Sequence, residues 1–269
     1  INSNEVIEIG RDNFVDKRGV ISNYYFDDSL NMIGYVESKK ETMRGNHYHP
    51  IQTQKCLLIK GSYISITKDL SVNNSVVETR LIREGDLSTI PPYVAHTMIF
   101  LEDSIFLNLV NGEREHHNYG ITHTIPYKLV DQQLFSNLIN SYLSTCRICG
   151  GGFRHYLSLG LSPLANNLNK NKDDKNDLYP LDLNFCDQCS NSQLSVVVPP
   201  KKMFDSYFYL SSTSQLFKDH FVEIANELKN TLKLKSSSLV IDIGSNDGIF
   251  LEPLKKLGVK AIGVEPAKN

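Results

Sequence analysis

Two pairs of cysteines with the spacing Cys-x-x-Cys constrain the fold of this chain more than any other feature. Cys146 and Cys149 lie in "STCRICGGG", and Cys186 and Cys189 lie in "NFCDQCSN". Two tight turns of this kind can aim four sulfurs at one ion, which predicts an all-thiolate zinc site. Four thiolates leave zinc no open position, so the ion should be structural and should stabilise a segment too small to build its own core.

A redox-active dithiol is the alternative interpretation of each cysteine pair, because such pairs also occur beside βαβ units. The fifth cysteine, Cys56, stands alone in a β-type run and is expected to be a small buried hydrophobe. Two unoxidised pairs fit a reducing compartment, so we expect a cytoplasmic protein.

Composition excludes several classes of partner. The chain has 269 residues, of which 41% are hydrophobic, and a formal net charge of −2. It is long enough for two domains, and it has no block of like charges that would bind nucleic acid or an anionic membrane. No apolar run approaches the roughly 20 residues that span a bilayer, and the N-terminal residues do not resemble a signal peptide.

The character of the sequence changes twice along the chain. Residues 5–130 contain short β-type runs separated by Gly, Pro, Asn and Asp, which predicts an all-β sandwich or barrel. Residues 131–144 have apolar positions at helical spacing and predict a connecting helix. A polar stretch at 166–177 separates the two cysteine pairs. The last residues, "SLVIDIGSNDGIFLEPLKKLGVKAIGVEP", read as a βαβ unit.

Two histidine motifs lie in the β-type region. One reads G-x-H-x-H-x4-Q-x6-G from Gly45 to Gly61, and the other places His96 after a Gly and a Pro. His47 and His49 are two apart on one strand, so both side chains point to the same face. His96 from a neighbouring strand can join them inside a barrel. These motifs resemble those of the cupin superfamily over most of residues 10–130, which implies a jelly-roll barrel.

The position of Gln54 is usually a glutamate in metal-binding cupins, so this chain lacks one anionic metal ligand. The "FVDKRG" and "MRGNHYH" segments resemble nucleotide-sugar cupins, namely dTDP-4-keto-6-deoxysugar 3,5-epimerases and 3,4-ketoisomerases. That resemblance implies proton transfer beside a sugar carbonyl, a role suited to imidazole. It implies His47 as the base, His49 as its partner acid and His96 as a third catalytic residue. The candidate substrate-binding residues of this region are Arg44, which suits a diphosphate, Gln54, Tyr63 and Tyr119.

Two other functions stay open for the barrel. It can be a noncatalytic sugar-binding or dimerising module, or it can be a metal-dependent enzyme in which the three histidines hold a cation. Taken by itself, His-x-His in a strand is more often incidental than catalytic. Nucleotide-sugar cupins are commonly dimers, so the resemblance also implies a homodimer through this region.

From about residue 145 to its end, the chain resembles the zinc-containing sugar C-methyltransferases, which use S-adenosylmethionine. The resemblance is carried by "CRICGGGFRHYLSLGLSPLANNL", "YPLDLNFCDQCSNSQL" and "MFDSYFYLSSTSQLFKDH". It implies that four residues contact the sugar nucleotide, although aromatic packing is the alternative for the two tyrosines. These residues are Tyr207, Tyr209, Ser211 and Ser214.

The βαβ unit contains D-x-G-x3-G after its first strand, and it ends its second strand with an acidic residue. Glycines at these positions let the backbone approach a ligand, and a carboxylate at the tip of the second strand can bind two ribose hydroxyls. The pattern resembles class I S-adenosylmethionine methyltransferases, and NAD binding is the alternative. The implied cofactor-binding residues are Asp242, Gly244, Ser245, Gly248 and Glu265.

The sequence therefore predicts a multidomain enzyme that modifies a nucleotide sugar. The expected domains are a cupin (1–130), a connecting helix (131–144), a zinc-binding and sugar-nucleotide module (145–210) and the start of a Rossmann-like methyltransferase domain (211–269). Because a doubly wound sheet needs more strands than one βαβ unit supplies, we expect the last domain to be truncated. A dTDP-linked keto-deoxysugar is the expected substrate, with surface polysaccharide or glycosylated metabolite biosynthesis as the context.

Overall fold

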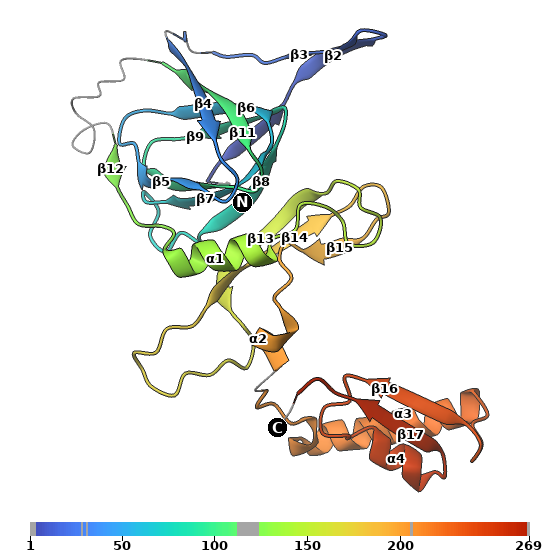
Figure 1. Cartoon of the computed structure of the whole chain (residues 1–269). Coiled ribbons are helices and arrows are strands. Elements are labelled where there is room, and N and C mark those ends of the chain that lie inside the picture. Colours follow the sequence, from blue (N-terminus) through green and yellow to red (C-terminus); the bar gives the residue numbers. More distant parts are fainter. Residues whose placement is uncertain (1–3, 28, 31, 112–123, 205–206, 268–269) are drawn as a thin grey trace. The chain divides into compact units, whose positions relative to one another are not determined.

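The computed structural model of the protein describes residues 4–27, 29–30, 32–111, 124–204 and 207–267 (Figure 1). They form two compact units. The first contains residues Ile1–Pro163 and Asn176–Val197, and the second contains Leu164–Lys175 and Val198–Asn269. Within the described residues, every helix is too short or too polar to span a bilayer.

Two five-stranded antiparallel sheets make up the N-terminal part of the first unit. The first sheet has the order β1 (Val6–Ile9), β9 (Asp86–Ile90), β6 (Gln54–Lys60), β11 (Ser104–Val110), β4 (Met32–Ser38). The second has the order β12 (Ile125–Pro126), β5 (Met43–Tyr48), β10 (Val94–Phe100), β7 (Ser62–Asp69), β8 (Glu78–Arg83). A separate hairpin pairs β2 (Arg11–Asp16) with β3 (Gly19–Asn23). The predicted all-β character of this region is confirmed for the described residues.

The core of this part follows from the alternation of side chains along the central strands. Tyr63, Ile82, Met98, Phe100 and Phe106 form one buried cluster. Truncating a buried aromatic ring of this kind to alanine costs about 3–5 kcal/mol of folding free energy. The cluster therefore supplies a large share of what stabilises the two-sheet fold.

The opposite face of the second sheet is covered by helix α1 (Gln132–Ser141), as predicted from its apolar spacing. Ile64 and Ile99 of the sheet pack against Leu134 and Leu138 of the helix. The helix begins at Asp131, whose side chain accepts a hydrogen bond from the backbone N–H of Leu134 at 2.8 Å. Such a cap satisfies an amide that the helix itself leaves unpaired.

The four cysteines belong to a small three-stranded sheet within the same unit. It consists of β13 (Arg154–Pro163), β14 (Leu178–Phe185) and β15 (Ser192–Leu194). The two five-stranded sheets are called the barrel below. Strand β13 contacts β8, the edge strand of the second of these sheets. Leu81 of β8 packs in one buried cluster with Cys146, Phe153 and Cys186. The zinc-binding segment and the barrel thus share a hydrophobic cluster.

The second unit contains α2 (Pro200–Phe204), a 3-10 turn (Ser211–Thr213), α3 (Gln215–Thr231), β16 (Leu239–Ile243), α4 (Leu251–Lys256) and β17 (Lys260–Val264). Strands β16 and β17 pair in parallel, and α4 connects them. The predicted βαβ unit is therefore observed. Among the described residues, no further strand of a Rossmann-like sheet pairs with it.

Candidate active site and metal centre

A β-bulge in β5 shapes the histidine site. On the neighbouring strand β10, His96 pairs with His47 and Thr97 pairs with Gly45, so Asn46 is the extra residue. Gly45 has a φ of +107°, and a Cβ atom there would lie 2.6 Å from the carbonyl oxygen of His96. Only glycine fits such a close approach of two backbones.

The bulge changes which side chains share a face. Arg44 and His47 are three positions apart, which would place them on opposite faces of a regular strand. In the structure Arg44 pairs with Met98 and His47 pairs with His96. Because directly paired residues share a face of the sheet, the bulge brings Arg44 to the same side as the histidines.

Asn46 holds the bulge in place. Its φ is +57°, in the left-handed region that Asn tolerates better than most residues. The side-chain Nδ2 donates to the carbonyl of Val130 at 2.9 Å, and Oδ1 accepts from the backbone amides of Leu129 and Val130 at 2.9 and 2.8 Å. Asn46 was missed by the sequence reasoning. An Asn that directly follows a Gly within a β-type run was the available signal.

The structure brings the three imidazoles together. The ring centroids of His47 and His96 are 4.7 Å apart, those of His47 and His49 are 5.0 Å apart, and those of His49 and His96 are 5.3 Å apart. One nitrogen of each ring lies within 4.8 Å of the others, and no described carboxylate joins this cluster. The arrangement can hold a proton, a cation or a polar group of a substrate.

His96 is the most buried of the three rings. Its Nδ1 lies 3.1 Å from the carbonyl oxygen of Val94, so Nδ1 carries the proton and donates. Burial, and secondarily the nearby charge of His47, lowers the pKa of His96 to about 3. His96 is therefore neutral at pH 7, and its buried, unprotonated Nε2 has no hydrogen-bond partner within the part of the chain that the structure describes.

Gln54 contacts the site through His49. The amide oxygen of Gln54 lies 3.1 Å from Nε2 of His49, and the amide nitrogen donates to the sulfur of Cys56 at 3.3 Å. Because an amide oxygen only accepts, this contact places a proton on Nε2 of His49. Gln54 thus orients His49 without adding a negative charge.

The other predicted substrate-binding residues of the barrel lie in different surroundings. Arg44 donates to the hydroxyl of Ser38 at 2.7 Å and to the carbonyl of Glu37 at 2.9 Å. Tyr63 is 1% exposed, lies in the core cluster, and has a pKa well above its usual value because it is buried. Tyr119 lies outside the described residues.

Two backbone turns of the same geometry present the four cysteines. In the first, the amide of Cys146 donates to the carbonyl of Gly151, and the amide of Gly150 donates to the carbonyl of Cys146. The second turn repeats both bonds, with Cys186, Asn191 and Ser190 in the corresponding places. Gly150 and Ser190 occupy the same position of their turns, with φ values of +73° and +59°.

The sulfur positions fit a tetrahedral zinc ion. The distance from Cys146 Sγ to Cys189 Sγ is 3.7 Å, and the distance from Cys149 Sγ to Cys186 Sγ is 3.5 Å. Zn–S bonds of about 2.3 Å at tetrahedral angles would separate the sulfurs by about 3.8 Å. Backbone amides of Cys149 and then Ile148 lower the pKa of the Cys146 thiol to about 6. The pKa of Cys189 is raised to about 12, because its bond to the Asn191 amide lowers it less than Cys149, burial and the other two thiols raise it. The four thiols therefore share few negative charges by themselves, and a metal ion would favour their thiolate forms.

In the second unit, Glu265 organises the glycine-rich loop after β16. Its Oε2 accepts from the amide of Asn246 at 2.7 Å, and its Oε1 accepts from the amide of Ala267 at 3.0 Å. Gly244 and Gly248 of this loop have φ values of +82° and +80°. The loop and the end of β17 are thereby held together at the carboxyl ends of the two parallel strands.

Ser245 and Asp242 complete the predicted cofactor-binding set. Ser245 is buried, and a Cβ atom on Gly263 of β17 would lie 2.4 Å from its hydroxyl oxygen, so the loop and β17 lie close together. Asp242 is half-buried in β16, directly opposite Gly263. The structure therefore gathers the predicted cofactor-binding residues at one edge of the βαβ unit.

The predicted sugar-nucleotide residues of the second unit lie next to this loop. Asn246 accepts from the backbone amide of Ser211 at 2.9 Å and donates to the carbonyl of Tyr209 at 2.9 Å. The rings of Tyr207 and Tyr209 are 6.4 Å apart. Ser214 caps α3, where its hydroxyl accepts from the amide of Phe217 at 3.4 Å.

Two comparisons with known proteins concern zinc binding and C-methyl transfer. Residues 146–204 match the protein family described as "Putative zinc binding domain". The chain is also 32% identical over 130 residues to the C-methyltransferase NovU of Streptomyces niveus, a match that covers 47% of this chain and 31% of that protein. The chain thus spans about a third of this relative's length. The zinc-binding segment and the resemblance to C-methyltransferases are confirmed.

Solved structures similar to this chain include dTDP-4-dehydrorhamnose 3,5-epimerase from Sulfolobus tokodaii, at 21% identity and a TM-score of 0.41, over 49% of this chain and 82% of that one. They also include the 3,4-ketoisomerase QdtA from Thermoanaerobacterium thermosaccharolyticum in complex with TDP, at 16% identity and a TM-score of 0.39, over 52% of this chain and 95% of that one.

The cysteine cluster predicts a specific metal content. The native chain should contain one equivalent of zinc by elemental analysis, and Cys149→Ser should lose it, because three thiolates hold zinc more weakly than four. Cys56→Ser is the matched control, since Cys56 lies in the barrel core away from the cluster. Zinc retained by Cys149→Ser, or lost equally from the control, would show that the cluster is not the metal site.

Proposed function

We propose that the barrel transfers a proton at the carbon beside the carbonyl of a nucleotide-linked keto-deoxysugar, as a 3,5-epimerase or 3,4-ketoisomerase does. The observation that carries this proposal is the cluster of three imidazoles without a described carboxylate, with Arg44 on the same face. A carbonyl acidifies the adjacent C–H bond, and an imidazole can remove and return that proton near neutral pH. The sequence resemblance supplies the substrate class.

His47 is the proposed base. The three rings form a nearly equilateral triangle, in which the centroid of His47 is closer to His96 than to His49. His96 is neutral and has an unprotonated Nε2, so it can accept a hydrogen bond from the protonated His47 and stabilise that charge. His49 is the proposed partner acid, and because its Nε2–H is directed to Gln54, the transferred proton would come from Nδ1.

Arg44 is the proposed contact for the diphosphate of the substrate. A guanidinium group binds phosphate oxygens through two parallel hydrogen bonds. The bulge places Arg44 on the face of the histidines, and its two contacts to Ser38 and Glu37 leave part of its fork of donors for a ligand.

We also propose that the C-terminal half belongs to a sugar C-methyltransferase that binds S-adenosylmethionine, so that one protein combines both activities. When bound, S-adenosylmethionine supplies the methyl group. The loop of residues 244–248 and Glu265 fit its binding, because they gather backbone amides and a carboxylate at the strand ends. The domain division at residues 130, 144 and 210 is part of the same proposal.

Binding of S-adenosylmethionine should depend on Glu265. Glu265→Gln removes a charge that suits ribose hydroxyls and weakens the bonds that hold the loop, so equilibrium dialysis with labelled S-adenosylmethionine should show at least tenfold weaker binding. Glu227→Gln, an exposed position on α3, is the control. If NAD binds and S-adenosylmethionine does not, the methyltransferase proposal is wrong.

The proton-transfer proposal is tested by deuterium exchange. Wild-type protein in D₂O should introduce deuterium into dTDP-4-keto-6-deoxyglucose, and His47→Ala should lower the rate by about 10²–10⁴-fold, the usual contribution of a general base. His220→Ala is the matched control, because His220 is exposed on α3. A wild-type barrel that binds the nucleotide sugar but exchanges no faster than His47→Ala would identify a binding module.

A metal-dependent reaction is the second candidate, favoured by the buried Nε2 of His96, which has no hydrogen-bond partner among the described residues, and by the three converging rings. We expect the native barrel to hold no tight cation, because Gln54 supplies an uncharged ligand. Gln54→Glu places a carboxylate beside His49 and should create binding of Mn²⁺ or Fe²⁺, measured by elemental analysis. A second metal equivalent in the native chain that His96→Ala removes would favour the metal-dependent enzyme instead.

A further inference from the structure

A cavity of about 480 Å³ lies where the zinc-binding segment meets the barrel, away from the histidines. It is lined by residues of β1, β8 and β9 on one side and of β13, β14 and Phe153 on the other. The histidine strand β5 is three strands from β8 in the same sheet. At a spacing of about 4.8 Å per strand, β8 is about 14 Å from β5 and about 10 Å from β10, which carries His96.

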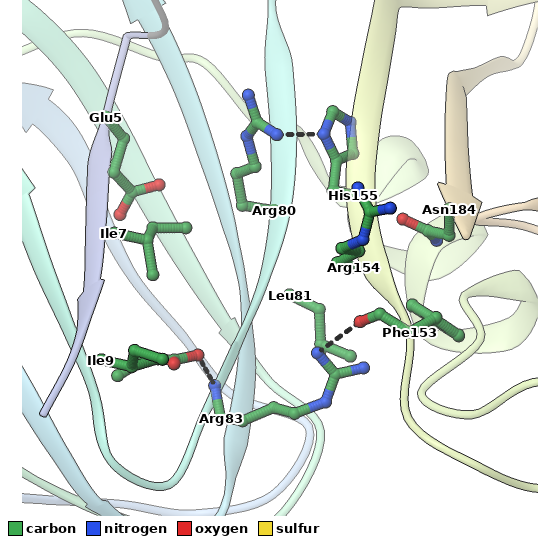
Figure 2. A pocket seen from close by; sticks show the side chains of 11 residues that line it. Glu5, Ile7, Ile9, Arg80, Leu81, Arg83, Phe153, Arg154, His155 and Asn184 are labelled. Atoms are coloured by element: carbon green, nitrogen blue, oxygen red, sulfur yellow. Dashed lines mark hydrogen bonds between the residues drawn. The ribbon is translucent and has the colours of Figure 1, made fainter. Parts of the chain in front are cut away.

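Three guanidinium groups line this cavity: those of Arg80, Arg83 and Arg154. Figure 2 shows Arg80 reaching His155 across the gap between β8 and β13 and Arg83 reaching the backbone of Phe153. Arginines rarely gather without anions between them, because each carries a full positive charge at any pH of interest.

Two of the three charges are balanced within the protein. Arg80 forms an ion pair with Glu78 at 3.3 Å, and Arg154 forms one with Asp187 at 3.1 Å. The Arg80 guanidinium also donates to Nδ1 of His155, so that nitrogen carries no proton.

Arg83 differs from the other two. Its guanidinium donates to the carbonyls of Phe153 at 3.3 Å and Ser144 at 3.1 Å, and no described carboxylate lies within ion-pair distance of it. Burial lowers the pKa of Arg83, which shows that its charge is partly desolvated. The carboxylate of Asp86 accepts from the backbone amide of Arg83 at 2.8 Å. The guanidinium carbon of Arg83 also lies 5.0 Å from the centre of the Phe153 ring, and the charge of Asp86 partly offsets the charge of Arg83. Because no described carboxylate forms an ion pair with it, the guanidinium keeps donors that an added anion can use.

Two carboxyl groups, those of Glu5 and Asp86, lie on the lining, and burial raises the pKa of each. Burial raises the pKa of Glu5 to about 7, so this side chain is partly protonated near neutral pH. Glu5 also receives a hydrogen bond from Ser88. The side chains of Ile7, Leu81 and Phe153 give the cavity an apolar wall next to the guanidinium groups.

We infer that this cavity is a second anion-binding site, which takes the phosphate group of a small phosphorylated molecule with Arg83 as its principal ligand. Arg80 of β8 and Arg154 of β13 add guanidinium donors, although their charges are paired with Glu78 and Asp187, and phosphate matches the planar donor fork of arginine. The volume is sufficient for a diphosphate, and the apolar wall suits the organic part of an ester. The site is separate from the proposed reaction in the barrel and does not depend on it.

The test is calorimetric titration of inorganic pyrophosphate into the full chain at constant ionic strength. Wild-type protein should bind it, Arg83→Gln should bind at least about tenfold more weakly, and Arg83→Lys, which keeps the charge, should retain more of the affinity. Arg147→Gln, an exposed position in the same segment, should bind as the wild type does. Arg154→Gln provides a second lining variant if Arg83→Gln fails to fold, and it should weaken binding severalfold.

Two further titrations distinguish this cavity from the barrel site and phosphate from other dianions. Arg44→Gln removes the proposed diphosphate contact of the barrel and should leave binding at the cavity unchanged. Binding that survives in folded Arg83→Gln, or that disappears only in Arg44→Gln, would overturn the inference. Equal affinity for succinate and pyrophosphate would overturn the assignment to phosphate, because it would show that any small dianion suffices.

Discussion

The hydrogen bonds of Asn46 are the interaction on which the arrangement of the first unit depends. Its side chain ties the bulge of β5 to Leu129 and Val130, the residues that lead into α1. Val130 lies in the cluster that α1 forms with the second sheet. One half-buried side-chain amide therefore fixes both the strand that carries His47 and the start of the helix that covers the sheet. Its three backbone contacts satisfy groups that a bulge and a loop would otherwise leave unpaired.

The zinc-binding segment is joined to the barrel by packing as well as by polar contacts. Leu81 of the barrel lies in one cluster with two of the four cysteines. The buried Asp182 of β14 accepts hydrogen bonds from Ser158 and from Thr79 of β8. Because a thiolate cluster this small derives its stability from the metal, loss of zinc would disturb the wall of the Arg83 cavity as well as the cysteines. The packing of Leu81 and the hydrogen bonds of Asp182 thus connect the zinc-binding segment to the barrel surface.

The two proposed chemistries share one requirement, which is a carbonyl that acidifies a neighbouring carbon of a sugar. In the barrel, proton removal and return rely on imidazoles, of which His96 is kept neutral by burial. In a C-methyltransferase the same kind of carbanion would be trapped by a methyl group. Joining both sites in one chain would raise the local concentration of one product at the other site. The cavity beside Arg83 adds a place where a phosphorylated molecule would contact both the barrel and the zinc-binding segment.

The sequence by itself determined the features that depend on local spacing. His47 and His49 share a face because strands have a period of two, the cysteine pairs form matching turns, and the βαβ unit follows from its glycine pattern. Tertiary structure decided the rest. Spacing alone would place Arg44 and His47 on opposite faces of β5. The bulge, which depends on pairing with β10 and on Asn46, places both side chains on the same face. The burial of Tyr63 and the docking of β13 on β8 depend likewise on contacts between distant segments, which no local pattern encodes.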